Sequence, residues 1–351
     1  MDTSGIDCER MPPSLHFKYQ SQSHQLEWGD HFAIPREQGF RDTAASELTA
    51  IVSEIESGQN WRSVVDAHFA TKNPWLHSII TSPSRTAFFG SVLPEGDGEV
   101  LDIGAGWGQL SRPLAARRPV VALEPVAERL AFIRAAARQD GVADRLAFVE
   151  ADYLELEFNA RFTAICAIGV LEWVGAFQSH TNPQERQRQF LRKTRSELAL
   201  AGHLILGIEN RIGLKYLLGC PDDHLGVPGV ACLPAPLASK RWLATTGHTL
   251  SSFTYSQSEL RDLLIEAGFQ KIEFFGAFPD YKLPAVILPF GENGEPVNTW
   301  LASHPIPPEH NGYDGRPLSA EFLEGLNAHY RTLAIEGIAH SFVPSFFVRA
   351  S

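Results

Sequence analysis

A glycine-rich turn followed by two acidic residues is the strongest chemical pattern in this sequence. Glycines alternate at Gly104, Gly106 and Gly108, between an apolar segment and a helical one, and Glu124 and Asp152 each end a later apolar segment. Glycines at such a turn let a ligand approach the backbone without meeting a Cβ. Carboxyl ends of parallel strands meet at one crevice, where Glu124 can accept from ribose hydroxyls and Asp152 from an adenine amino group. The pattern therefore predicts an adenosine-bearing ligand, against the alternative of a glycine turn without a ligand.

The spacing of the glycines narrows the choice of ligand. A dinucleotide fingerprint needs Gly-x-Gly-x-x-Gly/Ala, and here the last position is Gln109. A cofactor without a pyrophosphate does not need the usual phosphate contact at the helix start. The spacing disfavours a nucleotide-dependent oxidoreductase, which we keep as the less favoured alternative.

The segments 100–108 and 150–153, together with Glu124, resemble class I S-adenosylmethionine-dependent methyltransferases, and the resemblance runs from about residue 75 to the C-terminus. The segment 167–173 matches the fourth strand of that family and the loop that lines the methyl-donor site. The resemblance implies S-adenosyl-L-methionine as the cofactor. It also implies that the cofactor contacts Asp102, Gly104, Ala105, Gly106, Glu124, Pro125, Asp152, Tyr153 and Gly169.

A second group of polar residues follows the fifth predicted strand and suggests where the acceptor binds. Methyl transfer to a hydroxyl requires a base, and a histidine titrates in the right range. We predict His224 as this base, with Asp223 or Glu209 as the carboxylate that orients it. A loop histidine without a chemical task is the alternative, and a divalent metal on Asp222, Asp223 and His224 is disfavoured because adjacent ligands rarely give good geometry. We therefore expect no metal.

Cationic side chains near the same strand end predict how the acceptor is held. Arg211, Lys215 and Lys282 suggest an anionic group such as a carboxylate, a phosphate or an acidic sugar. The alternative is that these cations form ordinary ion pairs with Glu209 or Asp280. The predicted substrate-binding residues are Asn210, Arg211, Lys215, Tyr216 and Lys282.

The segments 208–219, 221–224 and 278–284 resemble a subgroup of bacterial methyltransferases linked to surface-polysaccharide and specialised-metabolite pathways. This implies a biosynthetic enzyme that methylates an oxygen, or less favourably a nitrogen, of a small polar metabolite or sugar. A non-catalytic protein that binds S-adenosylmethionine, acting as a regulator or an assembly partner, is the alternative. It would bind the nucleoside without turnover and would have a filled acceptor cavity.

The elements that position these residues alternate between strands and helices. Short apolar runs near residues 99–103, 120–123, 146–149, 163–171 and 203–208 read as strands, and runs at 271–278 and 342–349 add two more. The alternation predicts an α/β, Rossmann-like, doubly wound and mostly parallel seven-stranded sheet. Helical periodicity before the first of these strands predicts an N-terminal helical cap.

Composition shifts suggest the domain boundaries. We predict an irregular arm over residues 1–44, a helical cap over 45–93 and the methyltransferase domain over 94–351. Within that domain, segments rich in Gly and Pro predict a lid insertion at 211–253 and a loop-rich insertion at 285–317.

The overall composition limits the partners. The chain has 351 residues and a formal net charge of −11, which argues against nucleic acid and gives no reason for adsorption to an anionic membrane. The start lacks a signal-peptide pattern, and the four cysteines form no Cys-x-x-Cys pair. We expect a cytoplasmic protein with a small-molecule substrate. The oligomeric state stays open, a homodimer included.

Overall fold

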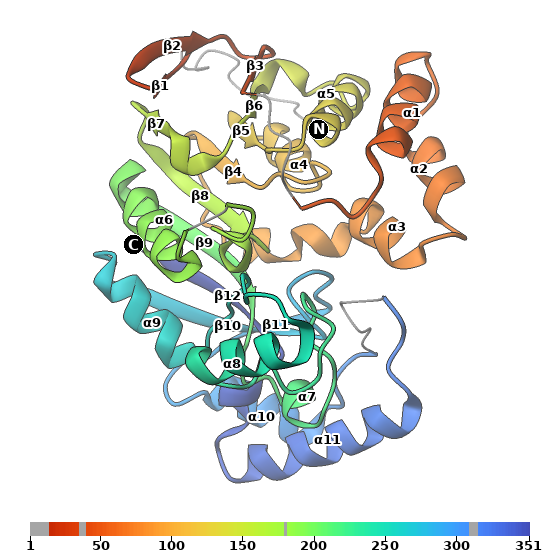
Figure 1. Ribbon diagram of the computed structural model, residues 1–351, viewed down its shortest axis with the longest axis vertical. Coiled ribbons are helices and arrows are strands. Elements are labelled where there is room, and N and C mark those ends of the chain that lie inside the picture. The colour runs from red at the N-terminus through yellow and green to blue at the C-terminus, as the bar shows by residue number, and fades with distance from the viewer. Residues whose placement is uncertain (1–13, 35–39, 179–180, 309–314) are drawn as a thin grey trace, which may run out of the picture.

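The computed structural model describes residues 14–34, 40–178, 181–308 and 315–351. Its centre is a nine-stranded sheet in the order β11-β10-β12-β9-β8-β4-β5-β6-β3 (Figure 1). The strands are β3 (His31–Ala33), β4 (Val100–Ile103), β5 (Val120–Leu123), β6 (Leu146–Glu150), β8 (Phe162–Ile168), β9 (Leu198–Glu209), β10 (Ile272–Phe278), β11 (Val286–Pro289) and β12 (Ser345–Ala350). The strands from β3 to β9 run parallel, whereas β12 is antiparallel to β9 and β10. All seven predicted strands are present, and β3 and β11 extend the two edges.

The strand order creates one crevice at the centre of the sheet. From β4 the chain builds outward to β5 and β6 on one side, and then returns to place β8 and β9 on the other. In open α/β sheets, ligands bind at such a reversal, beyond the carboxyl ends of the strands. The glycine turn after β4 and the loop after β8 therefore lie at the same end of the sheet.

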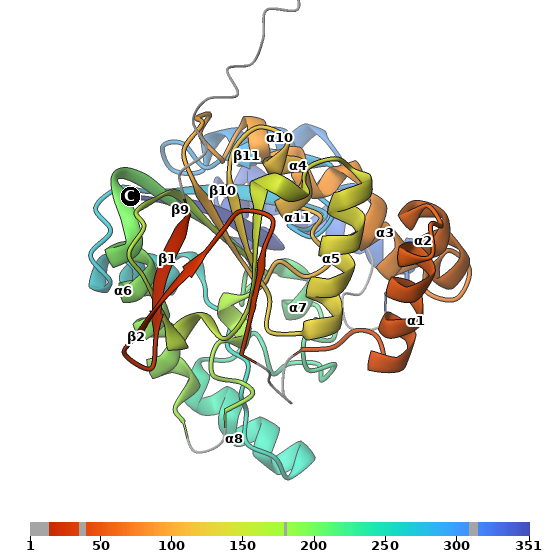
Figure 2. The ribbon, with the colours of Figure 1, turned by 90° about the horizontal axis from the view of Figure 1, so that it is seen from above.

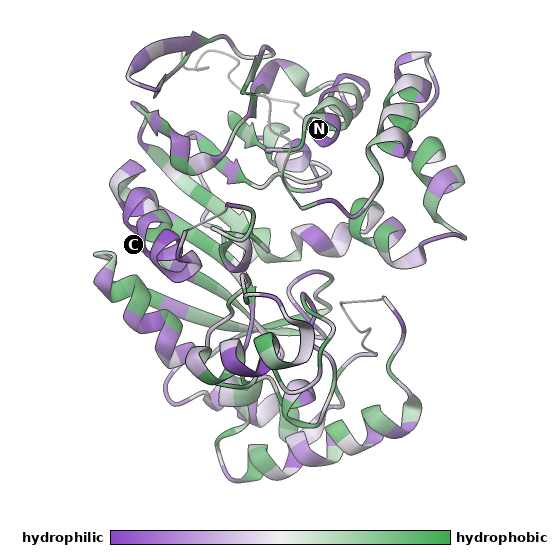
Figure 3. Ribbon diagram, in the orientation of Figure 1, coloured by the Kyte–Doolittle hydropathy of each residue, from purple (hydrophilic) through white to green (hydrophobic). Residues whose placement is uncertain are grey.

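Helices cover both faces of the sheet because its strands are apolar on both sides. In β5, Val120 and Ala122 pack into one core cluster, and Val121 and Leu123 pack into the other. One face is covered by α4 (Ser111–Ala115), α5 (Ala127–Gln139) and the 3-10 turn η1 (Pro83–Gly90), and the other by α6 (Pro183–Glu197), α9 (Gln257–Glu266), α10 (Glu295–Ser303) and α11 (Ala320–Ile335). Figure 2 shows α5 and α6 on opposite sides of the sheet, and Figure 3 shows apolar strands beside a polar α6 surface.

The predicted helical cap consists of α1 (Ala45–Glu56), α2 (Trp61–Phe69) and α3 (Pro74–Thr81), followed by η1. The side chains of Asn60 and Asn73 accept backbone N–H bonds at the starts of α2 and α3, which satisfies donors that a helix leaves free. The cap has its own apolar cluster, and Trp107 and Phe132 of the sheet domain belong to it. The cap is therefore packed onto the sheet domain through a shared core.

The predicted irregular arm is wrong over its described residues. Strands β1 (Leu15–Tyr19) and β2 (Gln22–Leu26) form a hairpin, β1 also pairs with β7 (Leu156–Phe158), and β3 joins the main sheet beside β6. The turn places Gln20 and Ser21 at φ values of 48° and 65°. This turn conformation usually carries Asn or Gly, so the sequence lacked the hairpin signal. Residues 1–13 and 35–39 of the predicted arm lie outside the described residues.

The two predicted insertions contain more regular structure than their composition indicated. Within 285–317 lie β11, which pairs with β10, and α10, where Pro296 occupies the first turn and does not break the helix. The 211–253 insertion contains α7 (Leu214–Leu217) and α8 (Ala235–Thr246), and Figure 2 shows α8 extending away from the sheet. Residues 309–314 of the loop-rich insertion lie outside the described residues.

Four further 3-10 turns connect these elements: η2 (Ala143–Arg145), η3 (Tyr153–Glu155), η4 (Leu171–Trp173) and η5 (Ala339–Phe342). Turns η3 and η4 follow β6 and β8, so they border the crevice. Across the described part of the chain, no helix is both long enough and apolar enough to cross a membrane.

Candidate active site

A pocket opens where β4, β5, β6 and β8 end, and we call it the glycine-loop pocket. Its lining includes Gly104, Glu124 and Asp152, which come from three different strand ends. The predicted convergence of these strand ends is therefore present in the structure. Other lining residues are Phe40, Leu123, Pro125, Arg129, Tyr153, Gly169, Trp173 and Phe190.

Backbone donors hold the Glu124 carboxylate in place. Its two oxygens accept from the N–H groups of Gly106, at 2.8 Å, and Val126, at 3.0 Å. Burial raises the pKa of this carboxyl, although the Arg129 guanidinium, 4.0 Å away, acts in the opposite direction. Gly106 thus contributes by fixing Glu124, whereas Gly104 forms part of the wall itself.

Asp152 and Tyr153 form the opposite wall of the glycine-loop pocket. Asp152 accepts from the Leu154 N–H, at 2.8 Å, and from the Gln178 amide nitrogen, at 2.7 Å. The Tyr153 hydroxyl is directed away from the predicted ligand and donates to Glu197 at 2.6 Å, so only the ring contributes to the wall. Contact of these residues with adenine stays a prediction.

The backbone at Gly104 leaves no room for a larger residue. Gly104 has a φ of +67°, and a Cβ there would lie 2.6 Å from the Val170 side chain. A buried carboxylate at Glu124 and a second carboxylate at Asp152, beside a pocket wall formed by the Gly104 backbone, together fit an adenosine-bearing cofactor.

Two predicted cofactor residues lie beneath the turn and do not line the pocket. The Asp102 carboxylate accepts a hydrogen bond from the Ser111 hydroxyl, and burial raises its pKa to about 7. Ala105 packs into the core cluster under α4 and α5. Both residues support the loop from below, so direct contact with the cofactor is not what their positions indicate.

A second cavity adjoins the first, and we call it the cap chamber. The two cavities share Phe40, Gly169 and Trp173, and the rings of Phe40 and Trp173 are 4.9 Å apart. The cap contributes Asn73, Trp75, Leu76, Ile79 and Arg85 to the chamber, and other elements contribute Asp42, Ile168, Glu172, Asp223, His224, Tyr281, Lys282 and Gly315. The cap thus covers the region beside the glycine-loop pocket.

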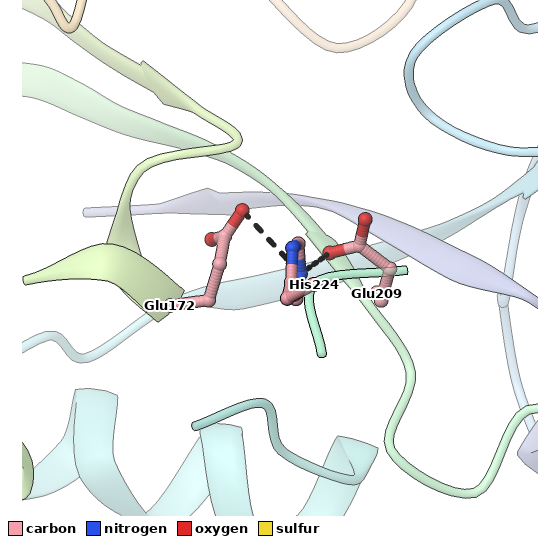
Figure 4. Close-up of side chains that lie close together, drawn as sticks. All are labelled: Glu172, Glu209 and His224. Carbon is pink, nitrogen blue, oxygen red and sulfur yellow. Dashed lines mark hydrogen bonds and ion pairs between the residues drawn. The ribbon is translucent and has the colours of Figure 1, made fainter. Parts of the chain in front are cut away.

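A buried imidazole lies between two carboxylates at the base of the cap chamber. His224 Nε2 is 3.0 Å from Glu209 Oε2 and 3.9 Å from Glu172 Oε1 (Figure 4). Glu172 comes from η4 after β8, Glu209 ends β9, and His224 comes from the 211–253 insertion. The predicted pairing of His224 with Glu209 is therefore present.

The charges of this cluster depend on each other. Burial alone would lower the pKa of His224, but Glu209, Asp222 and Glu172 together raise it to about 9. Burial and the Glu209 charge raise the pKa of Glu172 to about 7. For Glu209, His224 and Lys282 outweigh the effect of burial and hold the pKa well below its usual range.

Asp223 pairs with lysines and does not orient His224. Its Oδ2 lies 3.0 Å from Lys282 Nζ, and its Oδ1 lies 3.5 Å from Lys215 Nζ. Lys282 also binds Glu209. Of the two predicted partners, Glu209 is therefore the one that contacts His224. Lys215 and Lys282 have carboxylate partners here, and the third predicted anion-binding cation, Arg211, is paired with Glu259.

Four predicted substrate residues are not part of the cap chamber lining. The Asn210 amide donates to the carbonyls of Ser341 and Val343 and anchors the chain to the η5 region. Arg211 forms a two-pronged ion pair with Glu259 and lines a different cavity. Lys215 and Tyr216 are buried in α7, with the ammonium 5.1 Å from the ring centroid. The structure thus leaves Lys282 as the predicted cation that reaches the chamber.

Glu172 and Arg85 line the cap chamber, and neither was predicted from the sequence. Glu172 follows the mostly apolar strand β8, and a carboxylate just after such a strand was a usable signal. Arg85 lies in the cap and gave no local signal. Trp107 packs inside the cap core, whereas Trp173 lines both cavities.

The three residues of Figure 4 are also a possible cation ligand set, with ligand atoms within 4.8 Å of one another. Lys282 already neutralises the Glu209 carboxylate, and His224 is already hydrogen-bonded to Glu209. Asp222 accepts from the backbone N–H groups of His224 and Leu225, so the trio Asp222, Asp223 and His224 does not converge on one point.

The sheet, the glycine-loop pocket and the adjoining cap chamber define a Rossmann-like enzyme that uses an adenosine cofactor. Residues 100–194 match the family model described as "Methyltransferase domain". This segment is therefore a methyltransferase domain, and the cofactor of the enzyme is S-adenosylmethionine. The alternative of a non-catalytic protein that binds S-adenosylmethionine predicted a filled acceptor cavity, whereas the cap chamber is open.

Solved structures of other methyltransferases resemble this fold at low sequence identity. An S-adenosylmethionine-dependent methyltransferase from Thermotoga maritima is 18% identical, with 64% of this chain and 91% of that chain covered and a TM-score of 0.39. The CcbJ methyltransferase from Streptomyces caelestis is 17% identical, with 59% of this chain and 85% of that chain covered and a TM-score of 0.41. Phosphoethanolamine N-methyltransferase 2 from Haemonchus contortus, in complex with S-adenosyl-L-methionine, is 14% identical, with 86% of this chain and 59% of that chain covered and a TM-score of 0.44. No curated protein matches the sequence.

Proposed function

We propose that this methyltransferase transfers the methyl group to an oxygen of a small polar acceptor bound in the cap chamber. The observation that carries the proposal is the junction of the two cavities at Phe40, Gly169 and Trp173, with the buried His224–Glu209 pair beside it. This junction brings an acceptor in the chamber next to the cofactor pocket.

The cofactor supplies a methyl carbon that is bonded to a positively charged sulfur. Transfer requires the acceptor atom to lie about 3 Å from that carbon, in line with the leaving sulfur. The aromatic side chains of Trp173, Tyr281 and Trp75 line the chamber and restrict the space for the acceptor. When the oxygen–carbon bond forms and the carbon–sulfur bond breaks, the hydroxyl proton must leave the acceptor.

We assign the proton to His224, whose ring lies in the chamber wall and is oriented by Glu209. Because the pKa of His224 is about 9, the neutral imidazole is the minor form at pH 7. The value of kcat/KM should therefore rise about tenfold per pH unit between pH 7 and about 9, and then level off. A rate that falls over this interval would remove His224 from the role of base.

The atom that receives the methyl group can be tested with ¹³C-methyl S-adenosylmethionine. The protein is incubated with separate pools of sugars, hydroxy acids, phenols and amines, and the carbon chemical shift of each product identifies the bonded atom. We expect O-methyl products, lost in His224→Asn and retained in the control variant His304→Asn, whose histidine is exposed. N-methyl products alone, from a pool that contains both groups, would contradict the proposal.

A further inference from the structure

Arg85 is a buried cation in the cap chamber without a carboxylate partner. The residue is 9% exposed, comes from η1 of the cap and lines the chamber. Its Nη1 donates to the Lys282 carbonyl at 2.9 Å, and its Nε is buried without a hydrogen bond. Among the residues that the structure describes, no carboxylate lies within ion-pair distance of Arg85.

The other cations near the chamber are all neutralised. Lys282 binds Glu209 and Asp223, Lys215 binds Asp223, and His224 binds Glu209. The charges of Asp102 and Asp280 act on Arg85 only from a distance, and Asp102 accepts from Ser111. Arg85 thus differs from its neighbours in retaining donors that the described residues do not satisfy.

An uncompensated buried charge is costly, and a guanidinium stays charged at any pH that a protein survives. Its planar donors match the two oxygens of a carboxylate or a phosphate. The expectation of an anionic ligand, drawn from the sequence for Arg211, Lys215 and Lys282, fits the surroundings of Arg85 better than it fits any of those three.

We propose that Arg85 is the binding site for an anionic group, a carboxylate or a phosphate, that enters the cap chamber. The inference rests on the chamber being the acceptor side of the proposed function. The anionic group has two sources: the amino-acid end of the cofactor, reaching across the junction at Gly169, or the acceptor itself. Both sources place a negative charge against the guanidinium, and they can be separated experimentally.

The first arm of the test compares two probes that share the nucleoside. S-adenosylhomocysteine carries a carboxylate, and methylthioadenosine does not. Calorimetric titration is performed on the wild-type protein, on Arg85→Gln and Arg85→Lys, and on the control Arg117→Gln, which changes an exposed arginine. If the carboxylate comes from the cofactor, Arg85→Gln should bind S-adenosylhomocysteine about ten- to a hundredfold more weakly, with methylthioadenosine binding unchanged.

The second arm tests an anion that belongs to the acceptor. With S-adenosylhomocysteine saturating the protein, acetate and inorganic phosphate are titrated while the melting temperature is followed. If the acceptor provides the anion, either probe should raise the melting temperature of the wild type and of Arg117→Gln, but not that of Arg85→Gln. Arg85→Lys keeps the charge without the planar donors, so acetate or phosphate should raise its melting temperature by less than in the wild type. This variant replaces Arg85→Gln in the test if Arg85→Gln fails to fold.

Two results would overturn the proposal. Equal weakening of both nucleoside probes would mean that Arg85 only supports the fold around the Lys282 carbonyl. Unchanged S-adenosylhomocysteine binding, together with no effect of acetate or phosphate on the wild type, would mean that no anion binds there. Neither result affects the oxygen-acceptor proposal, because that proposal is decided by the carbon shift of the methylated product.

Discussion

At the scale of single residues, the protonation of His224 is set by the carboxylates around it. Glu209 lies 3.0 Å from the ring nitrogen, and Glu172 lies 3.9 Å away. The imidazolium therefore compensates buried negative charge in the folded state, and this compensation is absent in the unfolded chain. This couples the stability of the protein to pH through one identifiable side chain.

His224 should stabilise the fold only while it is protonated. Its pKa is about 9 in the fold against an ordinary value of 6.5, so its contribution of about 3 kcal/mol is complete below pH 6.5 and is lost as pH rises through 9. Urea unfolding of the wild type and of His224→Asn from pH 6 to pH 9.5 measures this. The difference in free energy of unfolding between the wild type and His224→Asn should shrink as pH rises. The corresponding difference for the control His304→Asn should not change with pH. A difference that grows with pH would contradict the assigned charge.

Glu124 should contribute directly to nucleoside binding. Its carboxylate is buried, lines the glycine-loop pocket and is fixed by two backbone N–H groups. Glu124→Gln should weaken the binding of S-adenosylhomocysteine by about 1–3 kcal/mol, because a charged acceptor for the hydroxyl groups of the nucleoside is lost. The control is Glu128→Gln on the next helix turn, outside the pocket lining. Unchanged affinity in calorimetry would remove Glu124 from the cofactor site.

At the scale of elements, the N-terminal hairpin is part of the core. Phe17 of β1 is fully buried and packs against Phe32, with ring centroids 4.8 Å apart, whereas the neighbouring Lys18 is exposed. Phe17→Ala should lower the free energy of unfolding by about 3–5 kcal/mol, and Lys18→Ala should change it little. Chemical denaturation checks both variants. A small effect of Phe17→Ala would mean that the hairpin is not integrated.

The turn after β8 depends on a glycine for two separate reasons. Gly169 has a φ of +74°, and a Cβ there would lie 2.8 Å from the Tyr281 hydroxyl. Gly141 has a similar φ of +72° with open space around it, so Gly141→Ala measures backbone strain alone, about 1–2 kcal/mol. Gly169→Ala should destabilise the protein more than Gly141→Ala does, and it should also weaken the binding of S-adenosylhomocysteine. Equal destabilisation by the two variants would show that the steric contact is absent.

At the scale of the whole molecule, the cap and the sheet domain share one apolar cluster. Trp107, from the glycine loop, packs against Phe69 of the cap and Phe132 of α5. The Trp107 indole also donates to Asp42, which forms an ion pair with Arg129 of α5. Separating the cap would expose this cluster, so the two parts are coupled energetically.

We therefore expect the cap and the sheet domain to unfold together. Hydrogen exchange of amides in α1 and α2 should report the same opening free energy as amides in β4 and β5. Phe132→Ala should lower both values by a similar amount, because its ring belongs to the shared cluster. A cap that opens at a much lower free energy, and is unaffected by Phe132→Ala, would show that it moves as an independent unit.

The sequence by itself determined the succession of strands along the chain and the convergence of three strand ends on one pocket. Runs such as Val120–Leu123 are apolar on both faces and are bounded by turns, which is a local property that needs no knowledge of packing. Gly104, Glu124 and Asp152 could be placed together because parallel strands of one sheet end at the same edge. The hairpin at β1 and β2 was missed because its turn uses Gln20 and Ser21 in place of a glycine.

Only the tertiary structure decided which charged residues are available to a ligand. The sequence singled out Arg211 and gave no signal for Arg85. In the structure, Arg211 is paired with Glu259, 48 positions away, whereas Arg85 donates to the carbonyl of Lys282, 197 positions away. In the same way, packing places Glu209 beside His224 and Asp223 beside Lys282. Ion pairs form between side chains that packing brings together, and the sequence separation of the partners carries no trace of it.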